Sequence, residues 1–152
     1  MIDCRPQGIC SWNYALTGEG WQASVRVGAM REQGAIEIDG RGFMIRKHGF
    51  ASGTWTLESG GQVLLTARKG NPFTRTFAIN GRDMDAELRA ASPFSRGMVL
   101  TGRGSDARIQ PRHPFTRRAS IDGPCPDPLL ACFAFWLSVI TWRRAANNSA
   151  GS

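Results

Sequence analysis

Apolar and polar side chains alternate along most of the chain, in short segments separated by glycine-rich turns. Within the segment 35–39, for example, Ile36 and Ile38 alternate with two acidic residues. A period of two residues is typical of a β-strand with one buried face and one wet face. The pattern predicts about eleven or twelve short antiparallel strands, whereas residues 1–10 are expected to form an irregular lead-in. The expected strands are 12–16, 21–27, 35–39, 43–47, 54–58, 62–68, 76–79, 86–89, 97–100, 107–110 and 118–121.

A different pattern near the C-terminus predicts a helix over 128–144. Asp127 is a good N-cap, and Pro128 suits the first helical position because its missing N–H is not needed there. Arg143 and Arg144 place positive charge at the C-terminal end of the helix dipole. These signals give the helix a defined beginning and end.

Between these ends, residues 129–142 are apolar on every side of the helix. Such a helix must be surrounded by protein or by lipid. The segment is about 21 Å long, and a bilayer core needs ~20 apolar residues, so a helix buried in protein is favoured. A C-terminal membrane segment remains the alternative. Residues 145–152 are expected to form a disordered tail.

A short motif recurs every 21 residues in the second half of the strand region. Proline, phenylalanine, a hydroxyl residue and arginine follow one another at 72–75, 93–96 and 114–117, with a weaker copy at 45–54. Each copy lies between two strand-like segments, so the repeating unit is a β-hairpin. Proline cannot donate to a sheet ladder and therefore marks the corner. The phenylalanine after it is expected to fold inward and plug the barrel end.

A sheet of this many strands usually closes on itself or splits into two layers. Twelve strands ~4.8 Å apart and tilted ~40° would form a barrel roughly 23–24 Å across, with a bore of ~12–14 Å. An α-helix with its side chains is ~10–12 Å wide and fits that bore. The sequence therefore predicts a mainly β protein, with a single domain over 1–144. Its closed antiparallel barrel of about 12 strands encloses the helix 128–144.

The combination of repeated hairpins, a proline-rich link and a hydrophobic helix resembles the tubby C-terminal-like fold. LURP-one-related and phospholipid scramblase-like proteins are the most similar in style. The segments that carry the resemblance are 35–46, 53–57, 133–137 and 142–144. The resemblance implies a barrel around a central helix, and it makes an anionic membrane lipid or a phosphoinositide-like ligand the expected partner. A scramblase-type calcium-binding loop is not recognisable in the chain.

The net charge is +7, and 17 of the 19 basic residues are arginine, which predicts a surface that attracts anions. The charges are scattered, so no specific nucleic-acid partner is expected. Cys4, Cys10, Cys125 and Cys132 have no paired C-x-x-C spacing, and no metal or cofactor is predicted. The N-terminus does not read as a signal peptide, which predicts a cytoplasmic protein able to lie peripherally at a membrane.

The densest positive feature is the segment 112–118, which could hold a phosphate through arginines and the free N–H groups of a turn. Arginines at the equivalent repeat position could line the same barrel rim. The alternatives are a solvated turn, or arginines that stack on the neighbouring phenylalanines for structural reasons. The candidate anion-binding residues are Arg75, Arg96, Arg112, His113, Arg117 and Arg118.

Catalytic motifs such as Gly-x-Ser-x-Gly or His-Glu-x-x-His are not found in the sequence. The favoured function is therefore non-enzymatic binding or scaffolding, with anionic phospholipid head groups or other phosphorylated groups bound at a basic barrel rim. The alternative function is that of a membrane-anchored protein with 129–142 as its C-terminal membrane segment. An uncharacterised hydrolase is the third option. Ligand identity and oligomeric state are left open by the sequence.

Overall fold

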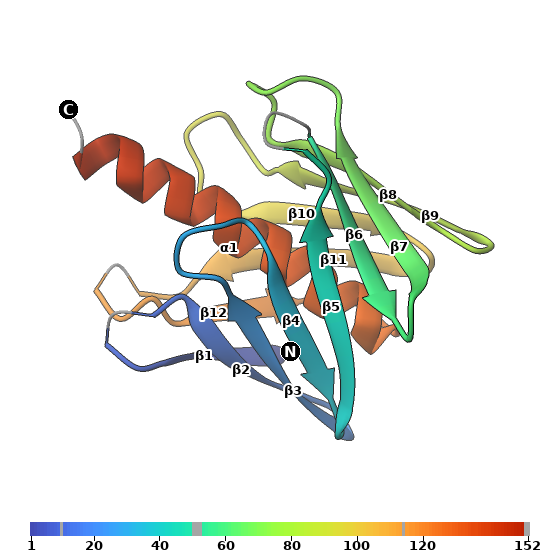
Figure 1. Cartoon of the computed structure of the whole chain (residues 1–152). Helices are drawn as coiled ribbons and strands as arrows, with labels where there is room; N and C mark the ends of the chain where they lie inside the picture. Colours follow the sequence, from blue (N-terminus) through green and yellow to red (C-terminus); the bar gives the residue numbers. More distant parts are fainter. Residues whose placement is uncertain (10, 50–52, 114, 151–152) are drawn as a thin grey trace.

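The computed structural model describes residues 1–9, 11–49, 53–113 and 115–150, and it shows a closed antiparallel β-barrel with a helix through it (Figure 1). Within these residues, twelve strands follow one another around the barrel in chain order. The predicted fold class is confirmed. The elements are β1 (Ile2–Gln7), β2 (Asn13–Gly18), β3 (Trp21–Val27), β4 (Gly34–Ile38), β5 (Arg41–Lys47), β6 (Thr54–Ser59), β7 (Gln62–Lys69), β8 (Thr76–Gly81), β9 (Met84–Ala90), β10 (Met98–Gly102), β11 (Ser105–Pro111), β12 (Ala119–Asp122) and α1 (Pro128–Ala150).

The alternation seen in the sequence is the alternation between barrel interior and solvent. In β5, Phe43 and Ile45 are buried while Met44 and Arg46 are exposed. Ile36 of β4 pairs directly with Phe43 and is buried with it. Each of the eleven expected strands overlaps one observed strand, with ends that differ by no more than two residues.

The N-terminal segment is a strand, so the predicted irregular lead-in is wrong. In β1, Ile2 and Cys4 point into the core, whereas Asp3 and Arg5 lie on the outer side. β1 pairs with β12 on one side and with β2 on the other, which closes the barrel. The β1–β12 pairing stops at Cys4, so Pro6 interrupts no ladder bond with β12. Proline and the small number of apolar residues hid this strand in the sequence.

The helix α1 fills the bore of the barrel, as the sequence predicted. Asp127 caps it, since its Oδ1 accepts the N–H of Leu129 at 3.0 Å and that of Leu130 at 3.4 Å. Every residue from Leu130 to Arg143 is buried. The hydroxyls of Ser138 and Thr141 donate to carbonyls one turn earlier, so these polar side chains are satisfied within the helix. Cys132 is a core residue.

By length and composition alone, α1 could cross a membrane: it has 23 residues, and its most apolar 18-residue window has a mean hydropathy of 1.3. Of that window, 78% is buried inside the barrel. The strands therefore cover the surface that a membrane segment would expose to lipid.

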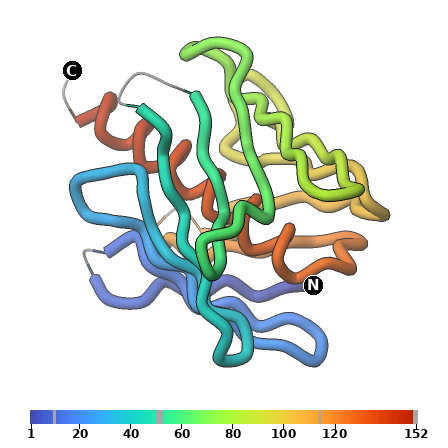
Figure 2. The backbone as a smooth tube through the Cα atoms, turned by 45° about the vertical axis from the view of Figure 1, so that its right-hand side comes forward, coloured from blue at the N-terminus to red at the C-terminus, as the bar shows by residue number. Residues whose placement is uncertain are grey.

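The helix ends later than predicted. It continues through Ala150, so residues 145–150 are helical and the prediction of a disordered tail is wrong for them. They are exposed and project from the barrel beyond Arg144 (Figures 1 and 2). Alanine and asparagine there do not break a helix already nucleated inside the barrel.

The two ends of the barrel differ in their connections. At one end, here called the turn end, β2–β3, β4–β5, β6–β7, β8–β9 and β10–β11 are joined by two-residue turns. In the Asp39-Gly40 turn both residues have positive φ, 47° and 84°, as a type I′ hairpin requires. At the opposite end, here called the loop end, the connections are five to seven residues long and α1 leaves the barrel.

The repeat phenylalanines lie in loops of the loop end and point into solvent. Phe73 is 95% exposed, Phe94 100% and Phe115 88%. The prediction that they plug the barrel end is therefore wrong. The bore is already filled by α1, whose side chains leave no room for them. Phe50, at the same place in the weaker copy, lies outside the described residues.

Candidate anion-binding site

Three exposed arginines form a row on the outer side of the barrel where β1, β12 and β11 lie side by side: Arg5 is in β1, and Arg112 and Arg118 are the first and last residues of the β11–β12 loop. Arg112 follows β11, and its N–H donates to the carbonyl of Arg118 at 2.7 Å. Arg118 precedes Ala119, which pairs with Cys4 of β1, so Arg5 is the next residue across the sheet. We call Arg5, Arg118 and Arg112 the arginine row. The closed barrel creates it by bringing the two ends of the strand region together.

One carboxylate lies against this row. The Oδ2 atom of Asp3 accepts from Arg5 Nε at 2.7 Å and lies 3.5 Å from Arg118 Nη2. The hydrogen bond from Arg5 and the proximity of Arg118 lower the pKa of Asp3 below its ordinary value, although partial burial opposes this. Asp3 thus carries one negative charge against three positive ones. Among the described residues, no acidic side chain pairs with Arg112.

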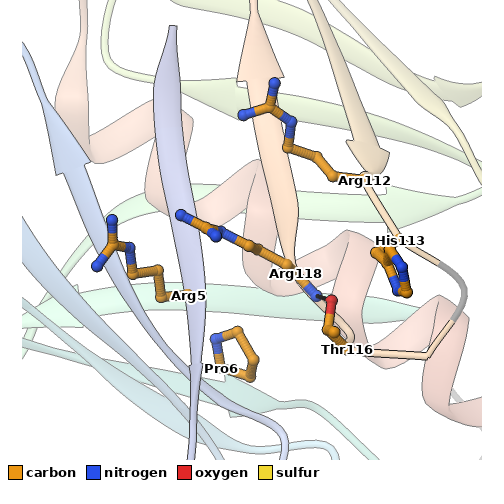
Figure 3. A pocket seen from close by; sticks show the side chains of 6 residues that line it. All are labelled: Arg5, Pro6, Arg112, His113, Thr116 and Arg118. Carbon is orange, nitrogen blue, oxygen red and sulfur yellow. Dashed lines mark hydrogen bonds between the residues drawn. The ribbon is translucent and has the colours of Figure 1, made fainter.

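An open cleft of about 610 Å³ lies beside the arginine row. Figure 3 shows the arginines on β1 and on the residues that flank the β11–β12 loop, with His113 and Thr116 in the loop itself. A guanidinium can bind phosphate or carboxylate oxygens bidentately through parallel N–H groups. The cleft is lined by Arg5, Pro6, Arg112, His113, Thr116 and Arg118.

His113 is oriented by the loop. Its Nδ1 accepts the N–H of Phe115 at 3.1 Å, so in the neutral ring the proton is on Nε2, which is free to donate. A neighbouring cleft of about 430 Å³ shares Arg112 and His113 and adds the exposed Arg96. The structure therefore brings together four predicted residues around two adjoining clefts: Arg96, Arg112, His113 and Arg118.

The other two predicted residues, Arg75 and Arg117, hold loops instead. The guanidinium of Arg75 donates to the carbonyls of Ser92, Pro93 and Ser95 at 2.7–2.9 Å. These residues belong to the loop of the next repeat.

Arg117 repeats this arrangement on the β1–β2 loop. Its guanidinium donates to the carbonyls of Ser11 at 2.6 Å and Ile9 at 2.5 Å, and it lies 5.1 Å from the ring centroid of Trp12. Neither Arg75 nor Arg117 stacks on the phenylalanine of its own motif, Phe73 or Phe115, which was one of the alternatives. Both guanidinium groups donate to loop carbonyls instead. Both arginines are only partly exposed.

Arg5 is the site residue that the sequence analysis missed. The period of two in Ile2 and Cys4 was the available signal, since it places Asp3 and Arg5 on the outer face. Its position beside Arg118 depends on barrel closure between β1 and β12. Residues 113 positions apart in the chain are brought together only by that closure.

A second basic group surrounds the point where α1 leaves the barrel. Glu32 forms ion pairs with Lys47, at 2.7 Å, and with Arg144. Lys69 lies nearby, with Nζ 5.2 Å from the ring centroid of Phe77. Burial, together with the positive charges of Arg144 and Lys47, lowers the pKa of Lys69 to about 8. Glu32 thus pairs with two of these three cations, as Asp3 does in the arginine row.

Three or more histidine, cysteine, aspartate or glutamate side chains do not gather in a metal-binding arrangement anywhere in the part of the chain that the structure describes. No family model matches the chain, and neither a curated protein nor a solved structure shows significant similarity to it. The general shape, a closed twelve-strand barrel with a C-terminal helix, is consistent with a tubby-like fold.

Proposed function

We propose that this protein is a non-enzymatic binding module that holds a phosphate group at the arginine row. The ligand class is an anionic phospholipid head group or another phosphorylated molecule. The observation that carries the proposal is the position of Arg5 in β1 beside Arg118 and Arg112 at the two ends of the β11–β12 loop, with one carboxylate, Asp3, next to them. A peripheral position at the cytoplasmic face of a membrane is part of the proposal.

The physical argument concerns the cost of this row without a ligand. Like charges directly opposite each other on a sheet are destabilising, by several tenths of a kcal/mol per pair. Asp3 offsets part of this repulsion for Arg5 and Arg118, and Arg112 keeps its full charge exposed. A phosphate in the cleft would accept hydrogen bonds from more than one guanidinium and relieve the remaining repulsion.

The resemblance to the tubby C-terminal-like fold supports the same ligand class. Under the proposal, the chain is a distant relative of the LURP-one-related and phospholipid scramblase-like proteins, and a phosphoinositide-like head group is one source of the phosphate. The barrel around a central helix agrees with this relationship in shape.

Calorimetric titration with inositol hexakisphosphate tests the proposal with a soluble probe. The double variant Arg112→Gln and Arg118→Gln should bind at least about tenfold more weakly than the wild type, since charge-assisted hydrogen bonds contribute about 1.5–3 kcal/mol each. The wild-type affinity should fall as salt is raised, because exposed charges are screened.

Arg108→Gln is the matched control. Arg108 is exposed on the same outer face of β11 but is not among the residues that line either cleft, so its loss should leave the affinity nearly unchanged. The proposal fails if the wild type does not bind the probe at moderate salt. It also fails if the double variant and the Arg108 control bind equally well.

A further inference from the structure

Exposed apolar side chains are concentrated at the tips of the loops of the loop end. Each of five loops there presents one large apolar residue, and each of these residues is at least 88% exposed. Burying such side chains in an apolar medium is strongly favourable, so their exposure in water is a cost that a partner would remove. The tip residues are Ile9, Met30, Phe73, Phe94 and Phe115.

Arginines hold three of these tips in place by binding the loop backbone. Arg117 binds the carbonyl of Ile9, and Arg75 binds those of the loop that carries Phe94. Arg143, at the end of the buried part of α1, donates to the carbonyls of Gly28 at 2.5 Å and Arg31 at 3.1 Å, on either side of the Met30 tip.

Side chains that precede the proline of the motif hold two further tips. Asn71 Oδ1 accepts the N–H of Phe73 at 2.9 Å, and His113 Nδ1 accepts that of Phe115 at 3.1 Å. The apolar tips are therefore displayed on constrained loops. Constraint before binding reduces the ordering cost that a flexible loop would add.

Charge, like the exposed apolar tips, is distributed unequally between the two barrel ends. The two-residue turns of the turn end carry two arginines, Arg82 and Arg103, and three acids, Glu19, Asp39 and Asp83. The link 123–127, which leads from β12 into α1 at the same end, adds Asp127. The loop-end connections carry one acid, Glu32, and six arginines: Arg31, Arg75, Arg96, Arg112, Arg117 and Arg118. The apolar tips thus project from the positively charged end of the molecule.

We propose that the loop end docks on an anionic lipid bilayer, with the five apolar tips inserted among the lipids and the arginines facing the phosphates. A protein partner usually covers a contiguous apolar patch, whereas each of these tips is a single apolar residue on a separate loop. Lipid can surround each tip separately, and anionic lipid complements the basic end. The barrel would stand on the membrane through this end, with the turn end facing away. Residues 145–150 of α1, which project from the same end, would lie among the lipid head groups.

This inference deepens the proposed function and rests on it for the preference for anionic lipid. The test is co-sedimentation with phosphatidylcholine vesicles that do or do not contain phosphatidylserine. The wild type should prefer the anionic vesicles. The triple variant Phe73→Ser, Phe94→Ser and Phe115→Ser should bind them at least about tenfold more weakly, since one fully buried phenylalanine corresponds to roughly a tenfold change or more.

The matched control is the double variant Met44→Ser and Val63→Ser. These residues are also exposed, by 63% and 54%, but they lie on the outer wall in β5 and β7. The control should bind vesicles like the wild type. Because all five side chains are largely in solvent, neither variant removes a core residue, and unfolding midpoints verify this.

Titration with inositol hexakisphosphate separates the two proposals. If the triple variant still binds inositol hexakisphosphate but binds the anionic vesicles more weakly than the wild type, the result supports insertion. A triple variant that binds vesicles like the wild type overturns insertion, and the phosphate site stands if the arginine variants still lose the probe. Vesicle binding that depends on phenylalanine, without any binding of the soluble probe, supports insertion and rejects the phosphate site. A different outcome would be a wild type that is dimeric in solution and a triple variant that is monomeric but binds vesicles as the wild type does. That outcome would mean that the tips form a contact between two copies of the chain, and it would overturn the inference.

Discussion

The two ends of this barrel differ in what fixes the conformation of their connections. At the turn end, two-residue turns with positive φ join the strands and fix the register of each hairpin, as at Asp39-Gly40 and Gly60-Gly61. At the loop end, longer connections expose apolar residues such as Phe94 and are held by arginines such as Arg75. Local backbone geometry decides the first end, whereas long-range contacts between loops decide the second.

Under the proposed function, this difference separates the residues needed for folding from those needed for binding. A substitution that breaks a tight turn at the turn end should then reduce stability and leave the proposed binding surface intact. The exposed tips of the loop end contribute almost nothing to the core, so they can change without loss of the fold. Loops on a rigid scaffold are the usual place for binding residues.

The largest expected effect comes from a substitution in the helix α1, whose buried side chains form the core between the two ends. Trp136 is fully buried in α1, and its Nε1 donates to the carbonyl of Arg26 at 3.0 Å. Trp136→Ala should lower the free energy of unfolding by about 3–5 kcal/mol, because it leaves a cavity and removes a buried hydrogen bond. Asn147→Ala, on the exposed part of the same helix, should change it by less than about 0.5 kcal/mol. Urea denaturation measures both, and equal effects would contradict the burial of α1.

Two glycine positions test whether backbone geometry determines stability at the turn end. Gly102 has φ of 105°, and a Cβ there would lie 2.5 Å from the carbonyl oxygen of Asp85. Gly102→Ala should therefore cost at least about 2–3 kcal/mol through strain and overlap. Gly104→Ala serves as the control, since φ is 71° and the nearest atom is 3.6 Å away, and it should cost about 1 kcal/mol. Thermal unfolding of the two variants should show this order, and a reversed order would contradict it.

The repeat arginines provide a smaller test at the loop end. Arg75→Met removes three hydrogen bonds to backbone carbonyls and should destabilise the protein by about 1–2 kcal/mol. Arg96 occupies the same motif position, but its exposed side chain forms no hydrogen bond within the described residues. Arg96→Met should therefore change the free energy of unfolding by less than about 0.5 kcal/mol. Chemical denaturation distinguishes the two. Similar losses would mean that both arginines are structural.

The last prediction concerns a pH dependence at the helix exit. The pKa of Lys69 is lowered from 10.5 to about 8, so the folded state disfavours its charged form. Stability from this group is therefore reduced below pH 8 and recovers as pH rises from 8 towards 10.5. Lys69→Met should be more stable than the wild type at pH 7, and this advantage should shrink over that range. A constant advantage, measured by urea denaturation at several pH values, would contradict the lowered pKa.

Much of the fold could be predicted because it depends on local patterns. The period of two located eleven strands, and Asp127, Pro128 and the apolar run located the helix and its role as filler. The strand β1 was missed because Pro6 and a short apolar pattern masked it. The helix beyond Arg144 was missed because its residues have no apolar face, and helix nucleated in the bore continues through them.

The candidate site shows the limit of the same method. The sequence alone determined which residues are basic, the repeat that places Arg75, Arg96 and Arg117 at equivalent positions, and the hairpin that carries Arg112 and His113. Only the tertiary structure decided that Arg75 and Arg117 hold loops and that the repeat phenylalanines face solvent. Only barrel closure decided that Arg5 joins Arg118, because strand order is a property of the whole chain. Periodicity reports which face of a strand is buried, but the neighbours of an exposed side chain are set by contacts between distant segments.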